Sequence, residues 1–324
     1  MKLLICILTG SLFSFTSFSS VIDNDTLALD TTEYVEIGNI LQFIKTEAND
    51  TANPILLFLH GGPGRTYMGA TETFSDSLIE EFIFVQWDQR KTGKTLDTNS
   101  VDDPLSVEQM QNDCEQLVLY LLKKYNRKKL FLVSHSWGSV LGFDLAKKHP
   151  ELVHAYISIS PIIDQVKATQ LTVKMLKKWA KKENNTAALK ELNAIHIPLE
   201  TKLDLFYQQR WLFIYNGVDF AKRADFRDVY FEWMDMWFPL WSSSVQTDQF
   251  TLTPELKCPL FLFEGIGDKQ KSHYLVKRYY KSVKAPMKEF VWFKESGHTV
   301  FNTEPLKLQI EIIAAKKKVL EAIK

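Results

Sequence analysis

The sequence has few cysteines and no excess of charge of either sign. Only three of its 324 residues are cysteine, which is too few for a disulfide scaffold or a cysteine-ligated metal site. Lys and Arg together number 39, as do Asp and Glu, so the formal net charge is zero. Such a balance gives no reason to expect nucleic acid or an anionic membrane surface as a partner. Cys114 and Cys258 stand in apolar stretches, and we expect buried thiols there, with one disulfide between them as the alternative.

The chain also lacks internal repeats and low-complexity tracts, and a long apolar stretch occurs at its start. Lys2 precedes this stretch, and Ser17-Phe18-Ser19 provides a small–x–small cleavage signal. We therefore expect residues 1–20 to be a signal peptide and the protein to be exported, either to the periplasm or out of the cell. Polar and small residues at 9–11 interrupt the run, which barely reaches the ~18 residues that a membrane span needs. An uncleaved membrane anchor is the alternative, and no stable membrane span is expected after signal removal.

Strand-like and helical segments alternate along most of the chain. Apolar or alternating runs predict strands at residues 34–37, 40–44, 54–59, 82–87, 130–133, 154–159, 260–264 and 288–293. Helical periodicity predicts helices at residues 106–125, 139–148, 272–283 and 306–323. This alternation predicts an α/β fold with a doubly wound, mostly parallel sheet, whose ligands bind at the carboxyl ends of the strands.

Residues 161–250 differ from the rest, because they are rich in Lys, Trp and Tyr and contain no strand-like run. Helical periodicity recurs there at residues 166–182, 203–215 and 229–241. We therefore expect residues 21–160 and 251–324 to form an α/β core and residues 161–250 to form an inserted helical cap. A segment inserted after the sixth strand lies over the carboxyl edge of the sheet, so some of its aromatic residues should line a pocket.

A candidate nucleophile lies in the segment 130–142, where a predicted strand turns directly into a predicted helix. The sequence there is Ser134-His135-Ser136-Trp137-Gly138, a relaxed form of the G-x-S-x-G elbow. Small residues are needed two positions before and after the apex, because strand and helix nearly touch at such a turn. That requirement selects Ser136 as the apex. A serine-rich turn that caps a helix is the structural alternative.

A serine nucleophile needs a neutral imidazole and a carboxylate that orients the imidazole. His298 follows the last predicted strand, and Asp268 follows the strand before it. The order Ser136, Asp268, His298 is that of the α/β-hydrolase fold. Asp164 is the rival acid, and Glu264 is a weaker one.

The same chemistry needs two backbone N–H groups that stabilise the developing oxyanion. One is the amide that follows the nucleophile, in Trp137. The other must come from the glycine-rich turn at residues 60–65, where Gly61 and Gly62 let the backbone approach a substrate closely.

Several motifs together resemble the proline iminopeptidase (prolyl aminopeptidase) family of α/β-hydrolases. They are His60-Gly61-Gly62-Pro63-Gly64, Asp88-Gln89-Arg90 with Gly93, Ser136-Trp137-Gly138-Ser139, Asp268 and Ser296-Gly297-His298. The resemblance covers most of the chain outside the cap. It implies a triad of Ser136, Asp268 and His298, an oxyanion hole formed by the Gly62 and Trp137 amides, and a cap that shapes the pocket. The implied activity is release of an N-terminal residue, often proline, from peptides.

The sequence departs from that family at Lys91 and Ser134, where glycine is usual, and at Ile266-Gly267, where Arg-Tyr is usual. The cap departs further. An aminopeptidase must pair the substrate's ammonium group with a carboxylate, and the family's cap carries a Trp-Glu pair for this purpose. The corresponding stretch here offers Tyr215-Asn216.

Other cap residues are candidates for that role. They are the carboxylates Glu232 and Asp235, with Trp233 beside them; a solvated helix face would explain the carboxylates equally well. The sequence thus predicts a serine hydrolase that works through an acyl-enzyme without metal or cofactor. Its substrate is expected to be a small peptide or amide, or alternatively a small ester. A ligand-binding protein on the same fold is the non-enzymatic alternative.

Overall fold

The computed structural model describes residues 28–99 and 105–322, so the predicted signal peptide at residues 1–20 lies outside the described residues. The described strands form an eight-stranded sheet in the order β1-β2-β4-β3-β5-β6-β7-β8. β1 pairs with β2 and β2 with β4 in antiparallel fashion, and the remaining pairs are parallel. The strands are β1 (Leu29–Ile37), β2 (Ile40–Ala48), β3 (Ile55–Leu59), β4 (Ile83–Trp87), β5 (Leu130–His135), β6 (Val153–Ile159), β7 (Leu260–Gly265) and β8 (Lys288–Phe293). The predicted α/β-hydrolase fold with a mostly parallel sheet is therefore confirmed.

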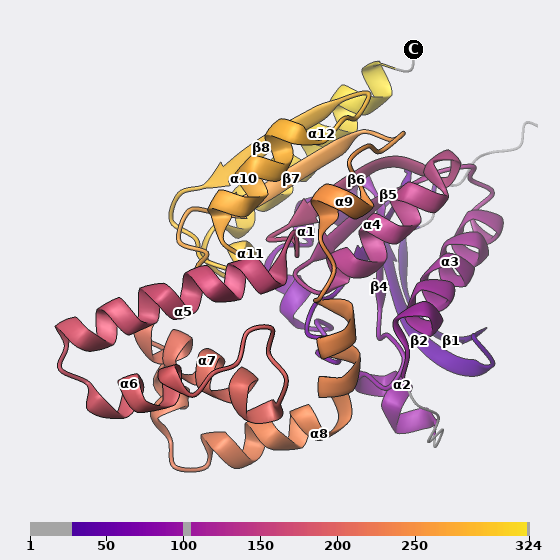
Figure 1. Ribbon diagram of the computed structural model, residues 1–324. Coiled ribbons are helices and arrows are strands. Elements are labelled where there is room, and N and C mark those ends of the chain that lie inside the picture. Colours follow the sequence, from indigo (N-terminus) through magenta and orange to yellow (C-terminus); the bar gives the residue numbers. More distant parts are fainter. Residues whose placement is uncertain (1–27, 100–104, 323–324) are drawn as a thin grey trace, which may run out of the picture.

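The two faces of the sheet bury separate apolar cores, because neighbouring side chains of a strand point to opposite faces. Leu57 of β3 and Leu132 of β5 contribute to one core, and Phe58 and Val133 contribute to the other. Helices cover both faces (Figure 1). The first core also contains residues of α3 (Val107–Lys124), α4 (Gly138–Lys148) and α10 (His273–Ser282). The second contains residues of α1 (Asp76–Glu81), α11 (Val300–Thr303) and α12 (Pro305–Glu321).

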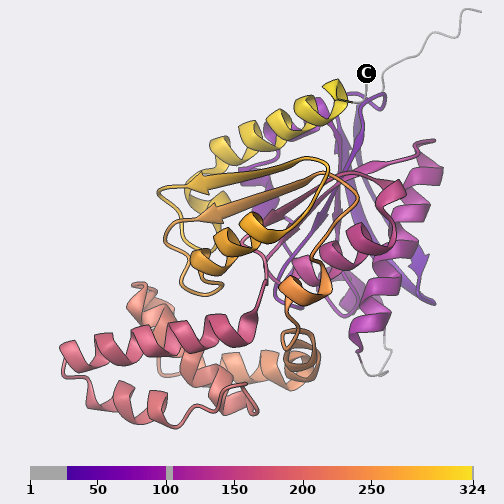
Figure 2. The ribbon, with the colours of Figure 1, turned by 45° about the horizontal axis from the view of Figure 1, so that its top comes forward.

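The chain between β6 and β7 is helical. Its helices are α5 (Gln165–Lys182), α6 (Thr186–Asn193), α7 (Lys202–Tyr215), α8 (Phe226–Ser244) and α9 (Gln249–Leu252). Figures 1 and 2 show α5 to α8 grouped together beyond one end of the sheet, away from α12. α8 contains Pro239, which removes a backbone donor and bends a helix. Figure 1 shows α8 changing direction along its length.

Cys114 and Cys258 are both buried and free. The prediction of buried thiols is confirmed, and the alternative of a disulfide between them is wrong. Burial raises the pKa of the Cys258 thiol to about 11, so this cysteine stays protonated and unreactive at neutral pH.

No helix within residues 28–99 and 105–322 has both the length and the apolar character of a membrane span.

Candidate active site

Ser136 lies at the sharp turn between β5 and α4. Its φ is 52°, a left-handed value that residues other than glycine rarely adopt. Its backbone N–H donates to the carbonyl oxygen of Ile159 at 3.0 Å, and its carbonyl oxygen accepts from the Ser139 hydroxyl at 2.6 Å. These hydrogen bonds hold the strained backbone in place. The residue therefore has the conformation expected at the apex of a nucleophile elbow.

The two small residues that flank the apex are small for different reasons. A Cβ on Gly138 would lie 2.4 Å from the carbonyl oxygen of Leu59, so only glycine fits where the helix touches β3. Ser134 is fully buried. Its hydroxyl forms hydrogen bonds with the Tyr156 hydroxyl at 2.8 Å and the Ser158 hydroxyl at 3.0 Å. A serine is accommodated at this position because β6 supplies two hydroxyl partners.

His298 lies between Ser136 and Asp268, although the three residues come from separate loops. Its Nδ1 is 2.8 Å from Asp268 Oδ2, and its Nε2 is 2.9 Å from Ser136 Oγ. Because a carboxylate only accepts hydrogen bonds, Nδ1 carries the proton, and Nε2 is left to accept from the serine hydroxyl. In this arrangement an imidazole can take the proton of an attacking serine.

Asp268 is buried in the loop after β7. Its Oδ1 accepts the backbone N–H groups of Gln270 at 2.7 Å and Lys271 at 3.0 Å. Burial alone would raise the pKa of Asp268, but the His298 imidazole and these two donors hold the pKa below its usual range. The carboxylate therefore stays ionised at neutral pH, where it can fix the tautomer of the imidazole.

The two rival acids have other environments. Asp164 caps α5, because its Oδ1 accepts the backbone N–H of Lys167 at 2.8 Å. Glu264 is fully buried at the end of β7, and neither of its carboxyl oxygens has a hydrogen-bond partner among the described residues. Burial, together with the nearby Asp268 carboxylate, raises the pKa of Glu264 well above its usual value. The surroundings of Glu264 therefore favour its protonated form.

The Gly62 and Trp137 amides lie in the two loops that meet beside Ser136. A Cβ on Gly61 would be 3.0 Å from the Cβ of Ser136, so the glycine-rich turn abuts the elbow. Gly62 has a φ of 120°, which glycine adopts freely. Within the described residues, no backbone carbonyl accepts a hydrogen bond from the N–H of Gly62 or of Trp137. Both N–H groups are thus available to a ligand oxygen, as an oxyanion hole requires.

The sequence predicts no role for Lys271. This residue is buried in the same loop as Asp268, between β7 and α10. Its Nζ donates to Gln165 Oε1 at 2.8 Å, and this bond joins the loop to the first residue of α5. Burial lowers the pKa of Lys271 to about 8. In the sequence Lys271 stands among other polar residues, and nothing there signals its burial.

Among residues 28–99 and 105–322, no group of three or more His, Cys, Asp or Glu side chains could hold a metal ion.

The Asp-Gln-Arg motif after β4 has structural contacts. The backbone N–H of Gln89 donates to His60 Nε2 at 3.3 Å, and its side-chain amide donates to the His60 carbonyl at 3.1 Å. Arg90 donates to Asp113 of α3 at 2.8 Å and to the Gly38 carbonyl at 2.7 Å. The motif therefore ties the glycine-rich turn, the N-terminal hairpin and α3 together.

The structure places the predicted cap residues in two settings. Glu232 is exposed, and Asp235 is exposed and forms an ion pair with Lys202 at 2.5 Å. Tyr215 and Asn216 are exposed at the end of α7. Trp233 is half-buried, and its contacts reach the glycine-rich turn. No described contact brings the Glu232 or Asp235 carboxylate to the Ser-His-Asp cluster.

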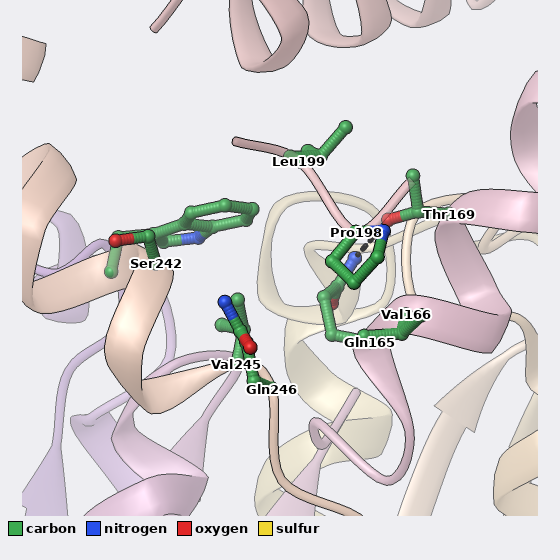
Figure 3. A pocket seen from close by; sticks show the side chains of 9 residues that line it. Gln165, Val166, Thr169, Pro198, Leu199, Ser242, Val245 and Gln246 are labelled. Atoms are coloured by element: carbon green, nitrogen blue, oxygen red, sulfur yellow. Dashed lines mark hydrogen bonds between the residues drawn. The ribbon is translucent and has the colours of Figure 1, made fainter. Parts of the chain in front are cut away.

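A small cavity lies where the first turn of α5 faces the last turn of α8 (Figure 3). Its volume is about 10 Å³, which is near the smallest that holds one water molecule. The lining residues are Gln165, Val166, Thr169, Pro198, Leu199, Trp241, Ser242, Val245 and Gln246. None of them belongs to the Ser-His-Asp cluster, so this cavity is not the substrate pocket.

The sheet, the elbow and the Ser-His-Asp contacts define an α/β-hydrolase. Residues 35–208 match the family described as serine aminopeptidase, S33, and the chain belongs to this family. It is therefore a hydrolase, and it is similar to proline iminopeptidases. A probable aminopeptidase, YbaC of Bacillus subtilis, is 25% identical over 296 residues, which are 84% of this chain and 91% of the relative. A putative proline iminopeptidase of Mycoplasma genitalium is 33% identical over 122 residues, or 37% of each chain.

Solved structures share the fold at low sequence identity. A proline iminopeptidase of Mycobacterium smegmatis has a TM-score of 0.63 and 13% identity, and the match covers 91% of this chain and all 100% of that one. A haloalkane dehalogenase of Bradyrhizobium elkani has a TM-score of 0.58 and 14% identity, with 90% and 99% coverage. These two proteins have different activities on the same fold, so the structural similarity shows the fold, and the activity depends on the residues of the site.

Proposed function

We propose that this hydrolase works through an acyl-enzyme formed on Ser136. The observation that carries the proposal is the pair of contacts of His298, at 2.9 Å from Ser136 Oγ and 2.8 Å from Asp268 Oδ2. Ser136 Oγ attacks the substrate carbonyl carbon while His298 Nε2 takes the hydroxyl proton. The Gly62 and Trp137 amides stabilise the oxyanion.

The first tetrahedral intermediate collapses, His298 gives its proton to the leaving amine or alcohol, and the acyl group stays on Ser136. In the second half, a water molecule attacks the acyl carbon while His298 takes a proton from the water. The second tetrahedral intermediate collapses as His298 returns that proton to Ser136 Oγ, and the carboxylic acid product leaves. Asp268 orients the imidazole and stabilises its charged form in both halves.

We further propose that the substrate is a small peptide or amide cleaved from its amino end. The aminopeptidase relative, which matches 84% of this chain, supports this substrate class. Proline 2-naphthylamide should therefore be hydrolysed, and Ser136→Ala should lower its kcat by on the order of 10⁶-fold. A fluorophosphonate probe should label the wild-type protein and leave the variant unlabelled. Labelling that persists in Ser136→Ala would mean that another residue is the nucleophile.

A small ester is the second candidate substrate. The exposure of Glu232 and the pairing of Asp235 with Lys202 favour it, since these carboxylates then hold no substrate ammonium group. Turnover of p-nitrophenyl acetate without turnover of the naphthylamide would establish the esterase. Glu232→Ala and Asp235→Ala should abolish amide turnover only if these carboxylates bind the ammonium. The absence of both turnover and labelling would favour a ligand-binding protein.

We also propose that residues 161–250 act as the cap over a core of residues 21–160 and 251–324, and that the protein is exported through residues 1–20. N-terminal sequencing of the protein from the producing cells tests the second point. A mature chain that begins near residue 21 supports export by a cleaved signal, and an intact Met1 in a membrane fraction supports the anchor instead.

A further inference from the structure

Helix α8 contacts the glycine-rich turn through two tryptophans that are one helical turn apart. Trp233 Nε1 donates to the Pro63 carbonyl oxygen at 3.0 Å. Trp237 packs against Gly64 so closely that a Cβ on that glycine would lie 2.0 Å from the indole Cε2. Pro63 and Gly64 directly follow Gly62. The cap helix therefore fixes the backbone next to one of the two amides assigned to the oxyanion hole.

The same helix contacts the elbow through its last residue. Trp137 Nε1 donates to Ser244 Oγ at 2.8 Å, and the Ser244 hydroxyl donates to the Trp241 carbonyl oxygen at 2.9 Å. Trp137 is fully buried and Ser244 is 2% exposed, so water does not replace this bond. The indole and the backbone amide belong to one residue. Fixing the Trp137 side chain therefore also restricts the second amide.

The bend at Pro239 explains how one helix makes both contacts. Trp233 and Trp237 precede the proline, and Ser244 follows it. The two halves of α8 run in different directions (Figure 1), so one half lies at the glycine-rich turn while the other reaches the elbow.

We propose that Trp233 and Ser244 are positioning residues for the oxyanion hole. The proposal rests on the mechanism above, in which the Gly62 and Trp137 amides bind the oxyanion. Such donors are effective only when they are held in place before the reaction. The cap thus contributes to transition-state stabilisation, in addition to covering the site.

Two conservative variants test the proposal, with p-nitrophenyl acetate as the substrate. Trp233→Phe keeps an aromatic ring and removes the donor to Pro63, and Ser244→Ala removes the acceptor for Trp137. Each should lower kcat about tenfold and leave KM within about twofold, since a loosened donor loses part of the ~10²–10³-fold effect of a deleted one. Affinity for phenylboronic acid, whose tetrahedral adduct on Ser136 occupies the oxyanion hole, should weaken by a similar factor.

Matched controls lie in the same cap. Trp211 Nε1 donates to Glu191 Oε2 at 2.7 Å, and the Ser243 hydroxyl donates to the Leu240 carbonyl at 3.0 Å. Neither bond reaches the oxyanion loops. Trp211→Phe and Ser243→Ala should therefore retain wild-type kcat and boronic acid affinity.

The outcomes separate this proposal from the mechanism on which it rests. If Ser136→Ala keeps its activity, the proposed mechanism is wrong. If Ser136→Ala is inactive while Trp233→Phe and Ser244→Ala turn over like the wild type, only the positioning role is wrong. Equal losses in the two controls would also overturn it, because they would show a general effect of the cap. Trp137→Phe and Ser244→Ala remove the same hydrogen bond. The double variant should therefore lose no more kcat than the more affected single variant.

Discussion

His135 Nε2 lies 2.9 Å from the backbone carbonyl oxygen of His298. A carbonyl only accepts, so Nε2 carries the proton, and His135 Nδ1 accepts from the Tyr67 hydroxyl at 3.0 Å. Burial lowers the pKa of His135 to about 3, which keeps the ring neutral as this pattern requires. A chain of two hydrogen bonds thus connects the loop after β3 to the backbone of the proposed base.

Replacing Tyr67 with phenylalanine should weaken that chain. Tyr67→Phe leaves His135 Nδ1 without its donor in a buried site, which costs about 1–3 kcal/mol of unfolding free energy. We expect kcat to fall severalfold as well, because the His298 backbone is less well held. Urea unfolding and ester turnover measure the two effects. Tyr120→Phe is the control. The Tyr120 hydroxyl donates to Glu33 of β1 at 2.8 Å, and β1 is at the opposite edge of the sheet from β8, which His298 follows, so kcat should not change. A Tyr67→Phe variant equal to wild type in both measurements would contradict this prediction.

The identity of the acid can be tested by two isosteric substitutions. Asp268→Asn should lower kcat by about 10⁴-fold, because an amide cannot hold the Nδ1–H tautomer or stabilise the charged imidazole. Asp164→Asn should retain both kcat and stability, since Asn caps helices as well as Asp does. Steady-state kinetics on one substrate compares them. A larger loss in Asp164→Asn than in Asp268→Asn would reverse the assignment.

The close contact at Gly138 predicts a specific loss of stability. An added Cβ would lie 2.4 Å from the Leu59 carbonyl oxygen and 2.7 Å from that of His60. Both atoms are backbone, so Gly138→Ala should destabilise the protein by about 1–3 kcal/mol and displace the elbow. We expect both kcat and the urea concentration at the unfolding midpoint to be lower in Gly138→Ala than in the wild type. Gly217→Ala is the comparison. Its Cβ meets nothing within 4 Å, so it should carry only the cost of its φ of 75° and keep full kcat.

Two buried histidines predict how stability depends on pH. Burial lowers the pKa of His60 to about 4 and that of His135 to about 3. Both values lie below the ~6.5 of an unfolded chain, so the unfolded state binds protons first as the pH falls. The stabilisation is complete above pH ~6.5 and is lost progressively toward the folded-state values, by about 2 kcal/mol per histidine at pH ~5.

The raised pKa of Glu264 changes stability in the opposite direction as the pH falls. Urea midpoints of the Glu264→Gln variant, measured between pH 8 and 5, therefore test the contribution of the histidines. Carboxylates in the unfolded chain titrate near pH ~4, so a decline that begins near pH ~6.5 belongs to the histidines. A midpoint that stays constant down to pH ~5 would contradict the prediction.

The sequence was sufficient to predict the sheet and the residues of the Ser-His-Asp cluster, because both depend on short-range patterns. Continuous apolar runs marked the parallel strands, and the parallel order brings the loops after β5, β7 and β8 to one edge. Ser136 directly follows β5, Asp268 lies in the loop after β7, and His298 lies in the loop after β8. Their contacts therefore follow from topology, without knowledge of any side-chain conformation.

Contacts between distant polar residues could not be predicted in this way. Ser106 caps α3, and its side chain accepts from the Gln109 N–H at 3.0 Å. The Gln109 side chain donates to Asp113 at 2.7 Å, one turn further along the helix. The burial of Lys271 beside Gln165 and the hydrogen bond from Trp233 to Pro63 depend on how residues 161–250 pack against the sheet domain. No local pattern encodes that packing, and the short helices α6 and α9 were missed for the same reason.

The hydroxyl cluster of Ser134, Tyr156 and Ser158 has a consequence for comparisons among related hydrolases. The identity of the first small residue of the elbow depends on side chains of the adjacent strand, so the three positions should change together during evolution. A glycine at 134 would remove one hydrogen-bond partner from each hydroxyl of β6 and leave the two bonded only to each other, at 3.0 Å. Relatives that retain serine at this position should therefore retain hydroxyl side chains on the neighbouring strand.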